Sequence, residues 1–120
     1  SGAEYGKQAP IVNVKESFER VPQDYYGMAK QVIGKVIEKT IKNMVNLRCF
    51  AIWGKYEKED RFISSLIKTK KTAYIKDCIY NYCHVDDLVR IIDWFINNNP
   101  KDKTYNVLVS PESMIKNGKE

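Results

Sequence analysis

The stretch "DYYGMAKQVIGKVIEKTIKNMVNLRCFAIWG" (24–54) decides the fold that the sequence predicts. Asp24 is a residue type that caps helices, and apolar residues follow it at three- and four-residue spacing to about Met44, which predicts a helix. Its apolar residues are Ala29, Val32, Ile33, Val36, Ile37, Ile41 and Met44. "VNLRCFAIWG" (45–54) is almost continuously apolar in its second half and stops at Gly54, which predicts a buried strand.

The remaining sequence continues this alternation of helices and strands. Two more helices are predicted, one in "EKEDRFISSLIKTK" (57–70) and one that Asp86 or Asp87 caps and that ends in "NNNP" (97–100). Short strands are predicted in "TAYI" (72–75), "IYNYCHV" (79–85) and "TYNVLV" (104–109). The pattern predicts an α/β fold with some parallel pairing. Because these strands are few for a parallel sheet, we expect residues 1–120 to form a single segment of a larger unit.

Length and charge narrow the possible functions. The chain has 120 residues, enough for one compact domain, and a net charge of +5. Its lysines are spread along the sequence, and the only tight cluster is "KTKK" (68–71), so a dedicated nucleic-acid role is not expected. No apolar run approaches the ~20 residues that span a bilayer, and the start shows no signal-peptide pattern. We therefore expect a cytoplasmic protein that has no membrane partner.

The cysteines favour the same compartment. Cys49, Cys78 and Cys83 are an odd number and form no Cys-x-x-Cys pair. Because Cys49 and Cys83 lie in apolar runs, we interpret them as reduced core residues. With His84 as the one histidine, these ligands are too few to predict a metal site.

Tyr26 and Lys30 are the first candidate site. Such a pair arises by chance in a chain this rich in both residues, so its position matters more than its spacing. At ~100° per residue the apolar residues of the predicted helix occupy an arc of roughly 180°, and Lys30 is the one charged residue inside it. Lys30 either extends its ammonium to solvent from the edge of the arc, or faces an internal cleft beside Tyr26. In a cleft, the ammonium favours the ionised phenolate that exchanges protons with a substrate hydroxyl.

Tyr26-x-x-x-Lys30 resembles the active-site motif of the short-chain dehydrogenase/reductase superfamily. The resemblance is to its extended branch, the NAD-dependent epimerases and dehydratases that act on nucleotide sugars. Further landmarks follow in the same order as in that family. "SGAEYG" (1–6) resembles S-S-A-x-x-Y-G, "NLRCFAIWG" (46–54) resembles L-R-x-F-N-V-Y-G-P, "YCHVDDLVRII" (82–92) resembles F-I-H-V-D-D-L-A-x-A, and "TYNVLVS" (104–110) resembles x-Y-N-V-G-S.

This resemblance implies a fold and an activity. The fold would be the later portion of a Rossmann-like parallel sheet with flanking helices, plus part of the substrate-binding region. Tyr26 would be the catalytic base and acid, Lys30 would hold the nicotinamide ribose of NAD or NADP, Ser1 would hydrogen-bond the reacting oxygen, and Phe50 would border the nicotinamide. The reaction would be hydride and proton transfer at a carbon of a nucleotide sugar, by an epimerase, dehydratase or reductase. A homodimer would form through the helix that carries Tyr26.

The sequence also departs from the family pattern. Ala51 replaces the usual asparagine, Lys55 the proline after the glycine, and Tyr80-Asn81 an Arg-Asp pair that commonly grips the diphosphate. None of the six glycines builds the Gly-rich turn that binds a dinucleotide pyrophosphate, so we expect this chain to be inactive alone. The alternative hypothesis is a non-enzymatic α/β binding or interaction module.

Overall fold

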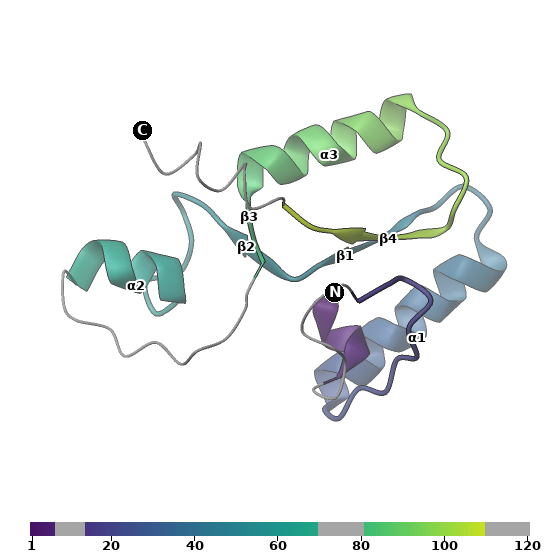
Figure 1. The fold of residues 1–120 in the computed structure, drawn as a ribbon, viewed down its shortest axis with the longest axis horizontal. Coiled ribbons are helices and arrows are strands. Elements are labelled where there is room, and N and C mark those ends of the chain that lie inside the picture. The colour runs from purple at the N-terminus through teal and green to yellow at the C-terminus, as the bar shows by residue number, and fades with distance from the viewer. Residues whose placement is uncertain (7–13, 70–80, 110–120) are drawn as a thin grey trace.

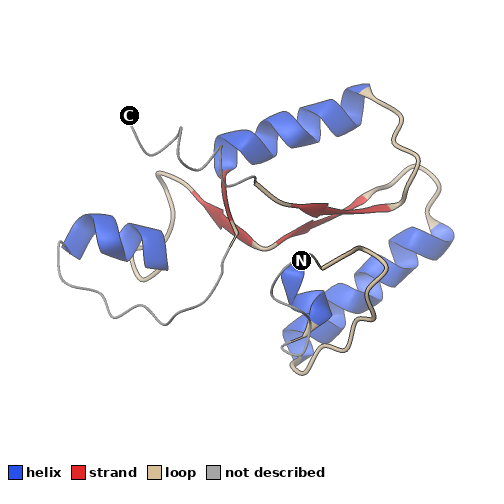
Figure 2. Ribbon diagram, viewed as in Figure 1, coloured by secondary structure: helices blue, strands red, loops and turns tan. Residues whose placement is uncertain are grey.

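The computed structural model describes residues 1–6, 14–69 and 81–109, and it has the α/β architecture that the sequence predicts (Figures 1 and 2). Its elements are, in chain order, the 3-10 turn η1 (Gly2–Tyr5), α1 (Tyr25–Thr40), β1 (Asn46–Cys49), β2 (Ala51–Trp53), α2 (Phe62–Thr69), β3 (Tyr82–His84), α3 (Val85–Asn97) and β4 (Thr104–Val107). Each helix within the described ranges is too short or too polar to cross a bilayer. The predicted strand 72–75 and Cys78 lie outside the described residues.

The strands form two parallel pairs, which confirms the predicted parallel pairing. β1 pairs with β4, and β2 pairs with β3. The single strand predicted over 45–54 is therefore wrong, because the chain leaves the first pair at Phe50 and enters the second at Ala51. Phe50 belongs to neither strand pair, and its ring stacks on Tyr5.

The β1–β4 pair presents two different faces, because side chains alternate along a strand. One face carries Arg48 and the polar residues beside it on β4, and Glu38 of α1 hydrogen-bonds both Arg48 and Thr104 there. The other face carries Tyr105, whose ring centroid lies 4.9 Å from that of Phe95 in α3. Figure 1 accordingly shows α1 and α3 on opposite sides of this pair.

α1 begins where the sequence predicts but buries a different face. Asp24 caps the helix, and its Oδ1 accepts a hydrogen bond from the Gly27 amide at 2.7 Å. The prediction that the apolar arc is the buried side is wrong, since Val32 is 59% exposed and Ile33 is 54% exposed. Gly27 and Gly34 are buried instead. Without side chains at these two positions, the helix approaches η1 and the charged groups beside it closely.

α3 begins two or three residues earlier than predicted, with a different cap. The prediction that Asp86 or Asp87 caps the helix is wrong, because His84 is the capping residue and its Nδ1 accepts a hydrogen bond from the Asp86 amide at 3.3 Å. Asp86 and Asp87 lie in the first turn, where carboxylates interact favourably with the helix dipole.

The fully buried side chains of the described residues include charged ones. Tyr5, Cys83 and Val107 are buried, and so are Glu4 and Arg48, each only 1% exposed. Cys83 and the half-buried Cys49 are free thiols, and burial raises the pKa of both. The prediction that Cys83 lies in the core is confirmed, and Cys49 lies at the edge of the core.

Candidate active site

Tyr26 and Lys30 lie together at the start of α1. Lys30 Nζ is 5.4 Å from the centroid of the Tyr26 ring, as the four-residue helical spacing predicts. The Tyr26 side chain is 60% exposed, and Lys30 is half-buried. The phenol is therefore open to an approaching molecule while the ammonium stays beside it.

The turn that follows Ser1 packs directly against this part of α1. Ser1 caps η1, and its Oγ accepts a hydrogen bond from the Ala3 amide at 3.3 Å. A Cβ added at Gly27 would lie 2.6 Å from the Ala3 carbonyl oxygen, so only glycine permits this approach. Tyr26 is the residue next to Gly27, so the structure brings the Ser1 turn to the turn of helix that carries Tyr26.

Phe50 completes the same region from the end of β1. Its ring is 37% exposed and stacks on Tyr5, with centroids 6.1 Å apart and planes 6° apart. A Cβ added at Gly2 would lie 2.5 Å from Phe50 Cδ1, so the ring also lies against the Ser1 turn. A cavity of about 220 Å³ is present beside it, lined by Gly2, Ala3, Gly6, Gln23 and Asp24.

These residues fit one end of a nicotinamide dinucleotide. An exposed phenol, a neighbouring ammonium and an aromatic edge suit a nicotinamide and its ribose hydroxyls. The residues do not fit the pyrophosphate of the dinucleotide. A pyrophosphate binds at a Gly-rich turn before a helix, and the six glycines of this sequence do not form such a turn. Gly6, with φ of 73°, is the described glycine that adopts a positive φ, and it follows η1 in place of a strand.

A network of charges, fully buried at Glu4 and Arg48 and partly buried at Arg20 and Glu38, lies beneath this region. Arg48 donates from Nε to Glu4 Oε2 at 3.1 Å and from Nη2 to Glu38 Oε1 at 2.8 Å. Arg20 donates to the same two carboxylates at 2.9 Å each, to Glu4 Oε2, which Arg48 also contacts, and to Glu38 Oε2. The network therefore links η1, α1 and β1 through four alternating charges.

The network has a consequence for protonation. Desolvation opposes ionisation of Glu38, but the hydrogen bond from Thr104 and the bond and charge of Arg20 hold the pKa of that carboxyl below its usual range. Burial lowers the pKa of Arg20, but its bonds to Glu4 and Glu38 outweigh this effect and raise it. Both groups of this pair are therefore held in their charged forms.

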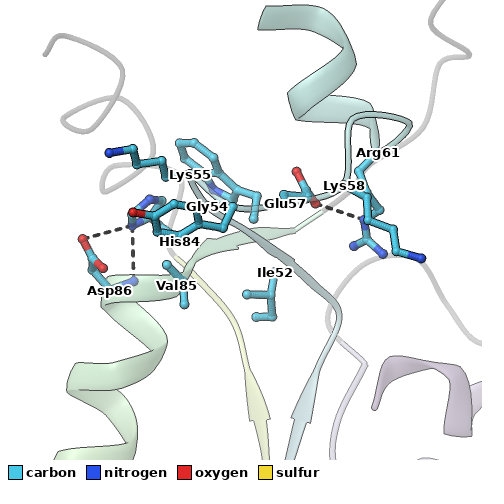
Figure 3. Close-up of a pocket in the computed structure, with 11 residues that line it drawn as sticks. Ile52, Gly54, Lys55, Glu57, Lys58, Arg61, His84, Val85 and Asp86 are labelled. Carbon is cyan, nitrogen blue, oxygen red and sulfur yellow. Dashed lines mark hydrogen bonds and ion pairs between the residues drawn. The ribbon is translucent and has the colours of Figure 1, made fainter. Parts of the chain in front are cut away.

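A second, larger cavity lies at the carboxyl ends of β2 and β3. It has a volume of about 740 Å³, and Figure 3 shows its two sides, with His84, Val85 and Asp86 toward α3 and with Lys58 and Arg61 toward α2. Trp53 and His84 meet edge to face at its base, with ring centroids 4.6 Å apart. Lys55 Nζ lies 5.5 Å from the centroid of the Tyr56 ring at its edge.

The second cavity was not predicted from the sequence. Its lining combines aromatic rings with three cations, Lys55, Lys58 and Arg61, and two acids, Glu57 and Asp86. Glu57 accepts a hydrogen bond from Arg61 at 3.0 Å. The signal in the sequence was the pair of apolar segments that end at Gly54 and Val85. Ligands of open α/β sheets bind beyond the carboxyl ends of the strands, and neighbouring parallel strands bring two such ends together.

The fold and the site together define a class of α/β protein with parallel strands and a Tyr–Lys pair at the start of a helix. The sequence model of the NAD dependent epimerase/dehydratase family matches residues 1–107, from Ser1 to the end of β4. The chain therefore belongs to the NAD-dependent epimerase/dehydratase family. No curated protein and no solved structure gives a significant match.

Proposed function

We propose that this chain is the catalytic side of an NAD(P)-dependent nucleotide-sugar epimerase, dehydratase or reductase, and that it needs a separate pyrophosphate-binding element for activity. The observation that supports the proposal is that the chain segments carrying the four candidate residues contact one another. Tyr26 and Lys30 share the start of α1, and the Ser1 turn contacts both that helix and Phe50.

Each of the four residues has a role in the proposed reaction. Bound NAD(P) would supply the acceptor and donor of hydride. Tyr26 takes the proton of a substrate hydroxyl while the carbon that bears it loses hydride, and returns the proton in the reverse direction. Lys30 holds the ribose hydroxyls and favours the phenolate, and Ser1 donates a hydrogen bond to the reacting oxygen. Phe50 excludes water from one side.

The larger cavity supports the nucleotide-sugar part of the proposal. A strand rises about 3.3 Å per residue, so Trp53 lies about 10 Å along the chain from Phe50. A substrate whose sugar lies at Tyr26 must extend away from it, and the cavity offers aromatic surfaces for a base and the cations Lys55, Lys58 and Arg61 for phosphates.

The proton-transfer role is tested by Tyr26→Phe in the product of the complete reading frame. We expect turnover to fall by about 10²-fold or more, since general acid–base catalysis contributes that much, while NAD(P) binding changes little. Tyr25→Phe is the matched control, because Tyr25 is the neighbouring tyrosine and is 91% exposed. It should leave turnover unchanged. Turnover that survives in Tyr26→Phe would overturn the proposed role.

The substrate class is tested by thermal unfolding of the same protein with a panel of nucleotide sugars. A ligand that binds the folded state raises the unfolding temperature, and the stabilisation grows with the logarithm of its concentration over Kd. We expect a nucleoside diphosphate sugar to stabilise the protein and Lys58→Gln to weaken the effect. Stabilisation by none of the panel, together with no turnover, would favour a non-enzymatic binding module.

We also propose that a second copy of the chain covers the exposed side of α1. Tyr25, Met28, Val32 and Val36 recur at helical spacing there, and each is at least 44% exposed. The resemblance to families that dimerise through this helix agrees with such a stripe. Light scattering should report a dimer for the wild type and a monomer for Val32→Glu, whereas Lys35→Glu on the same helix should stay dimeric. A monomeric wild type would contradict the proposal.

A further inference from the structure

The buried charges lie under every element that carries a candidate catalytic residue. Glu4 is in η1, which Ser1 caps, and Glu38 is in α1, which carries Tyr26. Arg48 lies two residues before Phe50 and donates to both carboxylates, at 3.1 and 2.8 Å. One guanidinium therefore links the three elements whose relative position defines the site.

The same guanidinium also contacts the stacked aromatic pair of Tyr5 and Phe50 through the Tyr5 hydroxyl. Arg48 Nη1 donates to Tyr5 Oη at 2.7 Å, and Tyr5 Oη donates to Asn106 Oδ1 at 2.8 Å. Phe50 stacks on the Tyr5 ring, and Gly2 packs against Phe50. A shift of Arg48 would therefore move Phe50 and the Ser1 turn together.

A purely stabilising role would not require these residue types. Burying ions is costly, and apolar residues of the same volume often give equal or greater stability. Charged groups with several hydrogen bonds each differ from apolar contacts in that they fix direction as well as distance. Gly34 supports this reading, because a Cβ there would lie 2.9 Å from Glu4 Oε2 and displace the carboxylate.

We propose that Glu4 and Arg48 are positioning residues, which hold Ser1 and Phe50 at a fixed place against the helix that carries Tyr26. This inference rests on the proposed function, because it assigns the network to the geometry of that site. Neither residue takes part in proton transfer. The network affects catalysis by holding Ser1 in position.

A double-mutant cycle with the product of the complete reading frame tests this dependence. Glu4→Gln keeps the shape of the side chain and removes its charge. We expect kcat to fall by about 10-fold or more, because small misplacements of reacting groups are costly, and NAD(P) Kd to change by less than about twofold. In the Ser1→Ala background Glu4→Gln should lower kcat by less than about twofold, because the effects of substitutions in residues that act as one unit are not additive.

Hydrogen exchange tests the position without turnover. The Glu4 amide donates to the Ser1 carbonyl at 3.1 Å, and the Ala3 amide donates to Ser1 Oγ. Glu4→Gln should speed exchange of these two amides in the protein without cofactor. Glu59→Gln is the matched control, since Glu59 is 82% exposed and pairs with Lys68 at the surface, and should change neither exchange nor kcat.

A milder variant decides the matter if Glu4→Gln does not fold. Tyr5→Phe keeps the ring and removes only the hydroxyl that Arg48 and Asn106 contact. It should lower kcat about threefold or more in the wild type and much less with Ser1→Ala. Three results would each overturn the inference. They are additive losses of kcat in the double-mutant cycle, unchanged hydrogen exchange of the Ala3 and Glu4 amides, and full activity of Ser1→Ala. Survival of turnover in Tyr26→Phe would instead overturn the proposed function.

Discussion

The α1 side of the sheet and the β2–β3 end are held together by different kinds of contact. Beneath α1, buried charges make directional hydrogen bonds, with Arg48 and Glu4 each 1% exposed. At the β2–β3 end, rings make the contacts, as between Trp53 and His84 and between Phe62 and Tyr82, whose centroids are 6.0 Å apart. Each of the ion pairs Arg61–Glu57 and Lys68–Glu59 at that end has at least one well-exposed partner.

This difference fits the two tasks proposed for the two regions. Proton transfer needs groups placed within fractions of an ångström, which several hydrogen bonds to one guanidinium provide. A binding cavity needs surface area and tolerates small adjustments, which aromatic contacts allow. Substitutions on the α1 side should therefore have the larger effects.

The largest effect is expected for Arg48→Ala. It removes a guanidinium that is only 1% exposed and contacts both Glu4 and Glu38, while Arg20 remains bonded to the same two carboxylates. Breaking a buried ion pair in this way costs about 3–5 kcal/mol. Urea denaturation of the full-length protein measures the change in the free energy of unfolding. Arg48→Met combined with Glu4→Met should recover part of the loss. A loss below about 1 kcal/mol for Arg48→Ala would contradict this, because the remaining bonds of Arg20 would then suffice to hold both carboxylates.

A smaller effect on the free energy of unfolding is expected when the pH is lowered. The pKa of Glu38 is below its usual value of 4.5 in the folded protein, because bonds from Thr104 and Arg20 outweigh its desolvation. This group therefore contributes stability above its unfolded pKa, and the contribution disappears as pH falls through the folded pKa. The free energy of unfolding should decline below about pH 4.5, and Glu38→Gln should make that decline shallower. Equal slopes in the two proteins would contradict the role of Glu38.

The smallest effect is expected for Arg90→Ala on α3. Arg90 is 76% exposed and donates to Asp87 at 2.7 Å one turn earlier. Exposed pairs of this kind contribute about 0.5 kcal/mol or less, and salt screens them. The free energy of unfolding should therefore stay within about 0.5 kcal/mol of the wild type, measured as for Arg48→Ala. A larger loss would remove the contrast between the two regions.

Local signals in the sequence predicted the elements with fair success. Asp24 caps α1 as expected, and the helix in "EKEDRFISSLIKTK" (57–70) and the strand in "TYNVLV" (104–109) are present. The errors came from contacts that local patterns do not encode. Phe50 looks like part of a continuous strand, but the chain changes its pairing partner there, from β4 to β3.

The candidate site was predicted in part. The Tyr26–Lys30 proximity follows from helical spacing alone, and the structure confirms it. The role of Glu4 was not predicted, because its partners Arg20 and Arg48 are 16 and 44 residues away in the chain. The cavity at Trp53 and His84 was missed for the same reason, since two distant strand ends form it.

The sequence by itself determined the α/β class, the parallel pairing and the family, because caps, apolar runs and ordered motifs are local features. Only the tertiary structure decided which side of α1 is buried. An apolar arc predicts burial when the hydrophobic effect dominates, but here Gly27 lets the η1 turn, and Gly34 the charged network, approach the helix instead. The fit of that network depends on hydrogen-bond geometry between distant residues, which no periodicity records.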